Sequence, residues 1–234
     1  MKDQYFGDVN DFRKYGLLRA LVVSEGLQLG VCWMLTERDN RADGNFLGYL
    51  ARPGLYRHRD PELFDWLKQV IEVEEDRRIA RIESSTLLGT AVFQSTILPD
   101  RRVERSEYFL EGRTRFSGCD VVFFDPDNGI EIGSRPRGRR HSSKHLFWDE
   151  IVETFLLGSS VLIYQHFIRE KRSSHTARIV EELRARTGAV AVFSFSTPHV
   201  LFILAAQGRH VDSFRGRKSA IESDWKDHIA ITEH

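Results

Sequence analysis

The sequence of 234 residues contains only two cysteines, Cys32 and Cys119, and they are not spaced as metal ligands. Each lies in or beside an apolar run, so we expect two buried, reduced thiols. The first fifteen residues are charged and lack the apolar segment of a signal peptide. No apolar run approaches the roughly 18 residues that a membrane span needs. These absences predict a cytoplasmic protein without a membrane partner.

The sequence also lacks an excess of charge of either sign, since it has 34 basic and 34 acidic side chains. Net charge therefore provides no general attraction to nucleic acid or membranes, and a site for a polyanion requires a local cluster. One loop supplies such a cluster, and in it we expect Arg137, Arg139 and Arg140 to contact phosphate. The alternative is an ordinary solvated surface. Hydrophobic residues make up 41% of the chain, which is typical of a folded protein and excludes extensive disorder.

The apolar pattern predicts strands that alternate with helices. Strands are expected at 29–35, 91–98, 121–124, 160–164, 189–195 and 200–206, and a long loop at 36–59. Helices are expected from Asp11 as a cap, from Asp60, and at 103–115, 144–157, 174–186 and 211–227. We therefore expect a single α/β domain over 1–234, with a small helical insertion at about 52–90. Its three-layer, Rossmann-like architecture would contain a mostly parallel, doubly wound sheet with a C-terminal antiparallel β-hairpin.

Polar side chains gather where the buried strands end, which is where open α/β sheets bind ligands. The strand 121–124 runs into the turn Asp125-Pro126-Asp127-Asn128-Gly129. Gln165 and His166 follow the next strand, and a histidine there can relay a proton. A purely structural turn remains the alternative for the carboxylates. The functional interpretation predicts one shared site at this edge of the sheet.

Two stretches carry a family resemblance. The first resembles the second half of class I S-adenosylmethionine-dependent methyltransferases. In it an apolar strand is followed by Asp125-Pro126, and then by a helix, a strand, a second helix and a terminal hairpin. The segment from Phe6 to Tyr15, which reads Phe-Gly-Asp-Val-Asn-Asp-Phe-Arg-Lys-Tyr, is similar to the opening element of the bacterial 23S rRNA adenine-N6 methyltransferase J family.

The resemblance implies S-adenosylmethionine as cofactor and RNA, DNA or a nucleotide-like anion as substrate. It places cofactor contacts at Asp8, Asp11 and Lys14, and the polar end of the first strand adds Thr36 and Asp39 as expected contacts. Together with the polar strand ends and the basic loop, it leads us to expect a catalytic set of Asp125, Asp127, Asn128 and His166, with Gln165 and the three arginines contacting substrate. The sequence departs from the family where 36–39 replaces a glycine-rich turn, and where Asp127 and Asn128 replace a proline and an aromatic residue.

Two other functions stay open. Asp125, Asp127 and Glu131 offer oxygen ligands for Mg²⁺ or Mn²⁺, with His166 as general base, in a metal-dependent hydrolase or transferase of phosphate esters. Sugar-nucleotide glycosyltransferases, which share the Asp-x-Asp pattern, are a lower-ranked variant of this first function. The second function is that of a non-catalytic, methyltransferase-fold protein that binds nucleic acid.

Overall fold

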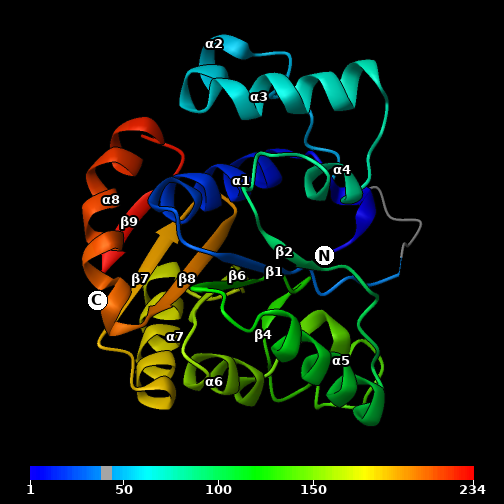
Figure 1. Cartoon of the computed structure of the whole chain (residues 1–234), viewed down its shortest axis with the longest axis vertical. Coiled ribbons are helices and arrows are strands. Elements are labelled where there is room, and N and C mark those ends of the chain that lie inside the picture. The colour runs from blue at the N-terminus through cyan, green and yellow to red at the C-terminus, as the bar shows by residue number, and fades with distance from the viewer. Residues whose placement is uncertain (38–43) are drawn as a thin grey trace.

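The computed structural model describes residues 1–37 and 44–234. Asp39, one of the expected cofactor contacts, lies outside them. A seven-stranded sheet in the order β2-β1-β3-β6-β8-β7-β9 forms the centre of the molecule (Figure 1). Its strands are β1 (Leu29–Cys32), β2 (Val92–Gln94), β3 (Val121–Phe124), β6 (Ser160–His166), β7 (Ala191–Ser196), β8 (Val200–Ala206) and β9 (Ala230–Glu233).

Five of the seven strands run in the same direction, because β2, β1, β3 and β6 pair in parallel and β7 is antiparallel to β8, which is itself antiparallel to β6. This confirms the mostly parallel α/β sheet and the C-terminal hairpin. The hairpin does not form the edge of the sheet. Strand β8 lies between β6 and β7, while β9, which was not predicted, occupies the edge beside β7.

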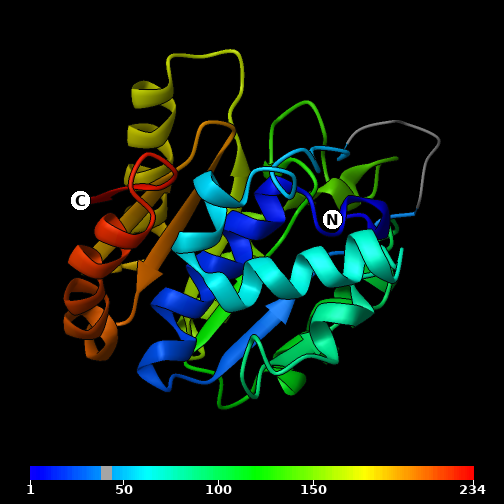
Figure 2. The ribbon, with the colours of Figure 1, turned by 90° about the horizontal axis from the view of Figure 1, so that it is seen from above.

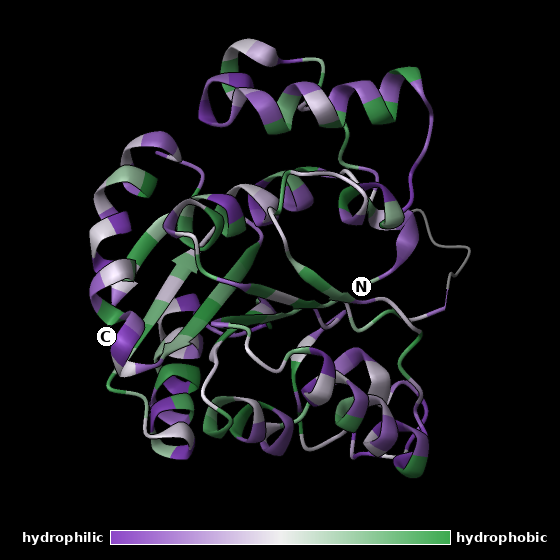
Figure 3. Ribbon diagram, in the orientation of Figure 1, coloured by the Kyte–Doolittle hydropathy of each residue, from purple (hydrophilic) through white to green (hydrophobic). Residues whose placement is uncertain are grey.

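Helices cover both faces of the sheet. One apolar core lies between the sheet and α1 (Val9–Leu21), α3 (Pro61–Lys68) and α8 (Val211–Asp224). The other lies between the opposite face and α5 (Arg102–Arg115), α6 (Trp148–Leu156) and α7 (Arg172–Thr187). Figure 3 shows the hydrophobic strands between these two helical layers. Among the described residues, no helix is long and apolar enough to cross a membrane.

Three local expectations were wrong. Helix α1 is capped by Asp8, whose Oδ1 accepts hydrogen bonds from the backbone N–H groups of Asn10 and Asp11, so Asp11 is not the cap. The segment expected as a loop up to residue 59 contains α2 (Pro53–Tyr56) and a 3₁₀ turn, Arg57–Arg59. Helix α6 begins at Trp148 and not at 144.

The late start of α6 has a simple cause. Strand β5 (His145–Leu146) pairs with β4 (Gly129–Ile130) in a small second sheet, and neither strand was predicted. Each is only two residues long, which is too short to show a periodic pattern. Helix α4 (Ala80–Glu83) was missed for the same reason. The small sheet holds the segment after β3 beside the segment before α6.

The order of the strands fixes the position of a ligand site. From β1 the chain crosses to β2 on one side, and from β3 it crosses to β6 on the other. The direction of winding thus reverses between β1 and β3, which lie side by side. In open α/β sheets a crevice forms outside the carboxyl ends of two such strands. Thr36 follows β1 and Asp125 follows β3, so both lie at this point.

Candidate functional site

A cavity of about 330 Å³ lies at the carboxyl ends of β1 and β3. This volume is within the range of small-molecule sites. Carboxylates, amines and aromatic rings line it, from the N-terminal segment, α1, the turn after β3 and the end of β6. The lining residues are Met1, Lys2, Tyr5, Asp8, Asn10, Asp11, Lys14, Gly44, Phe46, Asp125, Pro126, Asp127, Asn128, Lys144, Tyr164 and His166.

Lys14 joins the two sequence motifs at the centre of the site. Its Nζ lies 2.7 Å from Asp11 Oδ1 and 2.6 Å from Asp125 Oδ2, and all three side chains are buried. Burial lowers the pKa of Lys14, but the two carboxylates raise it by more than burial lowers it, so the net shift of the pKa is upward. The ammonium also lies over the Tyr164 ring, 5.4 Å from its centroid. Lys14 is therefore a fixed cation that orients Asp125.

Asp125 is held in an environment that disfavours its charge. Burial raises the pKa of this carboxyl, and Lys14 opposes the shift without cancelling it. Oδ2 accepts the hydrogen bond from Lys14, whereas Oδ1 has no hydrogen-bond partner among the described residues. Asp125 lines the cavity, so it offers an acceptor to a ligand there.

Asp127 has the opposite character. Burial raises the pKa of this carboxyl, but the N-terminal ammonium at 2.9 Å, a hydrogen bond of 2.8 Å from Thr36 and the cation of Lys144 lower it to about 2. Lys144 Nζ lies 3.7 Å away. Asp127 is thus a permanent anion at neutral pH, and two neighbouring acids with pKa values pushed apart take different roles.

Asp8 is the third notable carboxyl. Burial, with the nearby charge of Asp11, raises its pKa to about 7, although backbone N–H groups at the start of α1 stabilise the charged form. A group that titrates near neutrality in a cavity is a candidate proton acceptor.

The raised pKa of Asp8 predicts a pH dependence of stability. Because the folded-state pKa lies above the unfolded value, ionisation destabilises the fold as pH rises from about 4 to 7, by about 1.4 kcal/mol per pH unit across this window. Asp8→Asn keeps an N-cap acceptor but has no charge. The free energy of unfolding of the variant minus that of the wild type should rise by a few kcal/mol as the pH increases from about 4.5 to 7.5. Urea unfolding measures this difference. A constant difference between the two proteins would contradict the raised pKa.

The turn after β3 is supported by Gln165. Its Oε1 accepts a hydrogen bond of 2.8 Å from the Ile130 N–H, and the residue is buried. Gly129 has a φ of +106°, and a Cβ on it would approach this amide to 2.3 Å, so only glycine fits there. Gln165 was expected to contact substrate. In the structure it makes this positioning contact and lines a neighbouring cavity of about 300 Å³.

His166 and Asn128 stand between the two cavities, since both line each of them. His166 Nε2 lies 3.5 Å from the Tyr164 hydroxyl. Although the residue is exposed overall, packing around the ring lowers the imidazole pKa, and the Asp127 carboxylate opposes the shift. Asp125 and His166 line the same cavity, as the hypothesis of a shared site required.

Several expected residues are not in the cavity. Glu131 lines the neighbouring cavity, and its Oε1 accepts a hydrogen bond from the Trp148 N–H, so it does not join the Asp125–Asp127 pair. Arg137 forms an ion pair with Asp149, and the exposed Arg139 and Arg140 lie outside the lining. No group of three or more potential metal ligands occurs within the described ranges.

Several residues of the cavity had no predicted role. Tyr164 forms one wall, Phe46 forms part of the rim, and Lys144 brings a cation to Asp127. The buried Arg105 holds the segment that carries Lys144, because it donates to the carbonyls of Ser142 and His145. In the sequence, only the polar residues at the end of β6 and at the end of the basic loop indicated that these residues belong to a site.

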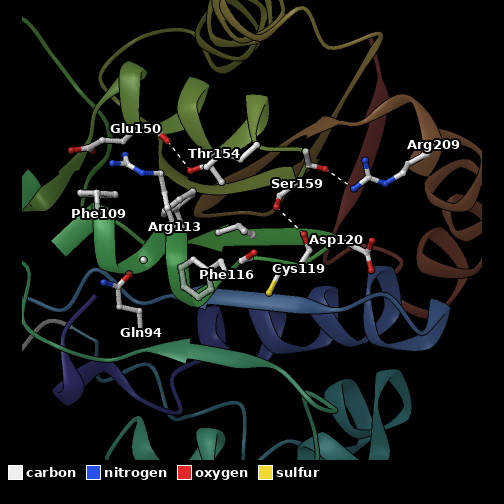
Figure 4. A pocket seen from close by; sticks show the side chains of 17 residues that line it. Gln94, Phe109, Arg113, Phe116, Cys119, Asp120, Glu150, Thr154, Ser159 and Arg209 are labelled. Atoms are coloured by element: carbon white, nitrogen blue, oxygen red, sulfur yellow. Dashed lines mark hydrogen bonds between the residues drawn. The ribbon is translucent and has the colours of Figure 1, made fainter. Parts of the chain in front are cut away.

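Another cavity, of about 200 Å³, lies under the sheet between α5 and α6, toward the amino ends of β3 and β6 (Figure 4). Cys119, Ser159 and Arg209 line it, and Ser159 and Arg209 donate hydrogen bonds to backbone carbonyls. Burial raises the pKa of the Cys119 thiol to about 11, so this cysteine is not a reactive thiolate. None of the site residues expected from the sequence lies here.

Comparison with known proteins adds little. No family model matches the chain, and neither does any curated protein. Among solved structures, a Legionella pneumophila protein described as family-model DUF519 is similar over 98% of this chain and 96% of its own. The TM-score is 0.45 and the sequence identity is 10%. A likeness at this level says nothing about the activity of the chain.

Proposed function

We propose that the chain is a divergent methyltransferase-like enzyme that binds S-adenosylmethionine in the cavity at the ends of β1 and β3. It modifies a nucleic acid or another anionic substrate at the turn from Asp125 to Asn128. The observation that carries the proposal is the 2.6 Å contact between Lys14 Nζ and Asp125 Oδ2. It joins the two motifs of the family resemblance, which lie 111 residues apart, in one cavity at the winding reversal.

The chemistry of the lining fits this cofactor. S-adenosylmethionine carries a sulfonium, an ammonium, a carboxylate and ribose hydroxyl groups. Asp8 offers an acceptor for the ammonium and hydroxyl groups, whereas Lys144, which is partly exposed and 3.7 Å from Asp127, offers a cation for the carboxylate. The bound cofactor supplies an electrophilic methyl group. Since the turn after β1 has no glycine-rich stretch, the ligand is held by side chains and not by close backbone approach.

The residues of the turn act on the acceptor group of the substrate. The free oxygen of Asp125 accepts a hydrogen bond from an amino N–H and so orients the nitrogen lone pair toward the cofactor. Lys14 fixes this carboxylate and keeps it from rotating. His166, which lines the same cavity, takes up the proton that the amine loses.

Titration with S-adenosylhomocysteine and with Mn²⁺ separates this proposal from the metal-dependent one. We expect S-adenosylhomocysteine at about 1 mM to raise the midpoint of thermal unfolding by several degrees, which corresponds to a linkage effect of about 2–3 kcal/mol. Mn²⁺ alone should leave it unchanged, since Lys14 already pairs with Asp125 and the N-terminal ammonium already pairs with Asp127. Stabilisation by Mn²⁺ and none by S-adenosylhomocysteine would overturn the proposal in favour of the hydrolase or transferase of phosphate esters.

A further inference from the structure

Two arginines beside the cavity have no carboxylate partner among the described residues. Arg13 on α1 is 5% exposed, and Arg59 in the turn after α2 is half-buried. Neither forms an ion pair within 4.0 Å in the part of the chain that the structure describes. The Nε atoms of both guanidinium groups are buried without a hydrogen-bond partner there. A buried cation without an ion-pair partner is costly, so Arg13, with the charge of Arg59 acting on it, indicates an anion that belongs there.

A third buried polar atom without a partner lies beside them. Within the same described ranges, His228 Nδ1 is also buried without a partner, and its ring packs edge-on against Tyr56 at 5.0 Å. Tyr56 in turn packs against Phe12 of α1, and Arg59 donates to the Asp224 carbonyl. These contacts bring α1, α2 and the segment after α8 together, as Figure 2 shows.

Electrostatics support the same grouping. Burial lowers the pKa of His228 to about 4, and the charges of Arg59 and Arg13 contribute to this shift. The acidic group that acts on both Arg59 and His228 is Asp227, an exposed side chain that forms no ion pair with either. The carboxylates that act on the two arginines, Asp8 on Arg13 and Asp227 on Arg59, form no ion pair with them within 4.0 Å in the described ranges, so the cluster keeps two positive charges without a direct counter-charge.

The cluster adjoins the rim of the cavity. Arg13 donates to Asn10 Oδ1 at 3.3 Å, and Asn10 lines the cavity. Phe46, which is 63% exposed, also lines it and stacks on His199 with centroids 6.2 Å apart and planes 7° apart. An exposed aromatic platform next to unpaired cations is the arrangement by which proteins hold single-stranded nucleic acid.

We propose that Arg13, Arg59 and His228 bind a backbone phosphate of a single-stranded nucleic acid, with a neighbouring base against Phe46. This inference rests on the proposed function, because it takes the anionic substrate of the cavity to be a nucleic acid. It moves the phosphate contact away from the loop of Arg137, Arg139 and Arg140. The cation of Arg137 is already paired with Asp149, whereas those of Arg13 and Arg59 have no such partner in the described ranges.

Fluorescence anisotropy with a labelled RNA of about 12 nucleotides, at several salt concentrations, tests the site. We expect Arg59→Gln to weaken binding about tenfold and to reduce the slope of log affinity against log salt by about 0.7, which is one phosphate contact. Arg13→Met should have a similar effect. Arg139→Gln is the matched control and should change neither quantity. Arg59 is half-buried at a helix end, so its variant remains informative if the Arg13 variant does not fold.

Calorimetric titration of the same variants with S-adenosylhomocysteine separates the two ideas. Unchanged affinity for this ligand, together with weaker RNA binding in the Arg59 variant, supports the phosphate site. If the Arg59 variant binds RNA as the wild type does, or if the wild type binds none, the phosphate site is wrong even where S-adenosylhomocysteine binds. If RNA binding depends on Arg59 while S-adenosylhomocysteine does not bind, the phosphate site stands and the enzymatic proposal fails. The chain would then be a methyltransferase-fold protein that binds nucleic acid.

Discussion

Replacing Lys14 with methionine should lower the free energy of unfolding by about 3–5 kcal/mol at pH 7, because it leaves Asp11 and Asp125 buried without their shared cation. The loss should be smaller at pH 5. Burial raises the pKa of Asp125 above its unfolded value, so the destabilising charge is present at high pH and is relieved as the pH falls. Urea unfolding at the two pH values measures both effects.

Lys68→Met is the matched control for this change. Lys68 Nζ lies 3.6 Å from Glu72, and both side chains are exposed. The variant should therefore lose about 1 kcal/mol or less of unfolding free energy, and the buried cluster around Lys14 should be unaffected. Equal stability of the two variants would mean that Lys14 does not compensate buried charge. The central place of the Lys14–Asp125 contact in the site would then be wrong.

Replacing Asp125 with asparagine should reduce methyl transfer by roughly 10²-fold or more while changing stability by about 1 kcal/mol. The amide keeps an oxygen for Lys14, which still pairs with Asp11, and removing a charge that burial disfavours offsets the weaker contact. Transfer of labelled methyl from S-adenosylmethionine to a mixture of cellular RNA and DNA measures the activity.

Asp120→Asn provides the comparison, since Asp120 precedes the other end of β3 and lines no part of the site. Its variant should transfer methyl groups at the wild-type rate. If Asp125→Asn retained full transfer, the carboxylate would not act on the acceptor. If it lost several kcal/mol of stability together with activity, Asp125 would have a structural role alone.

The sequence predicted the position of the turn because two strong local signals coincide there. The residues of β3 are all apolar, which marks a central strand, and polar residues follow it at once. The contact between Lys14 and Asp125 has no such local signal and was not predicted, since the family resemblance implied only that Lys14 lies near the cofactor site. Long-range pairing of this kind depends on how α1 packs against the sheet.

The basic loop shows the limit of local charge patterns. The dense run of arginines at 135–140 suggested phosphate binding, but density of charge along the chain does not reveal which charges are already paired. Asp149 neutralises Arg137, whereas Arg13 and Arg59 come from separate segments and meet only in the fold. Strand β9 was missed because its burial is partial and it pairs only at the edge.

Isothermal titration calorimetry with S-adenosylhomocysteine tests the central claim most directly. We expect saturable binding at one site per chain in the wild type. We also expect at least roughly tenfold weaker binding in Asp8→Asn, which loses a charged hydrogen-bond acceptor of the cavity. Asp212→Asn alters a carboxylate that is 97% exposed, and its affinity should be unchanged. The absence of binding to the folded wild-type protein at millimolar ligand, or equal affinities in all three proteins, would contradict a cofactor site in this cavity.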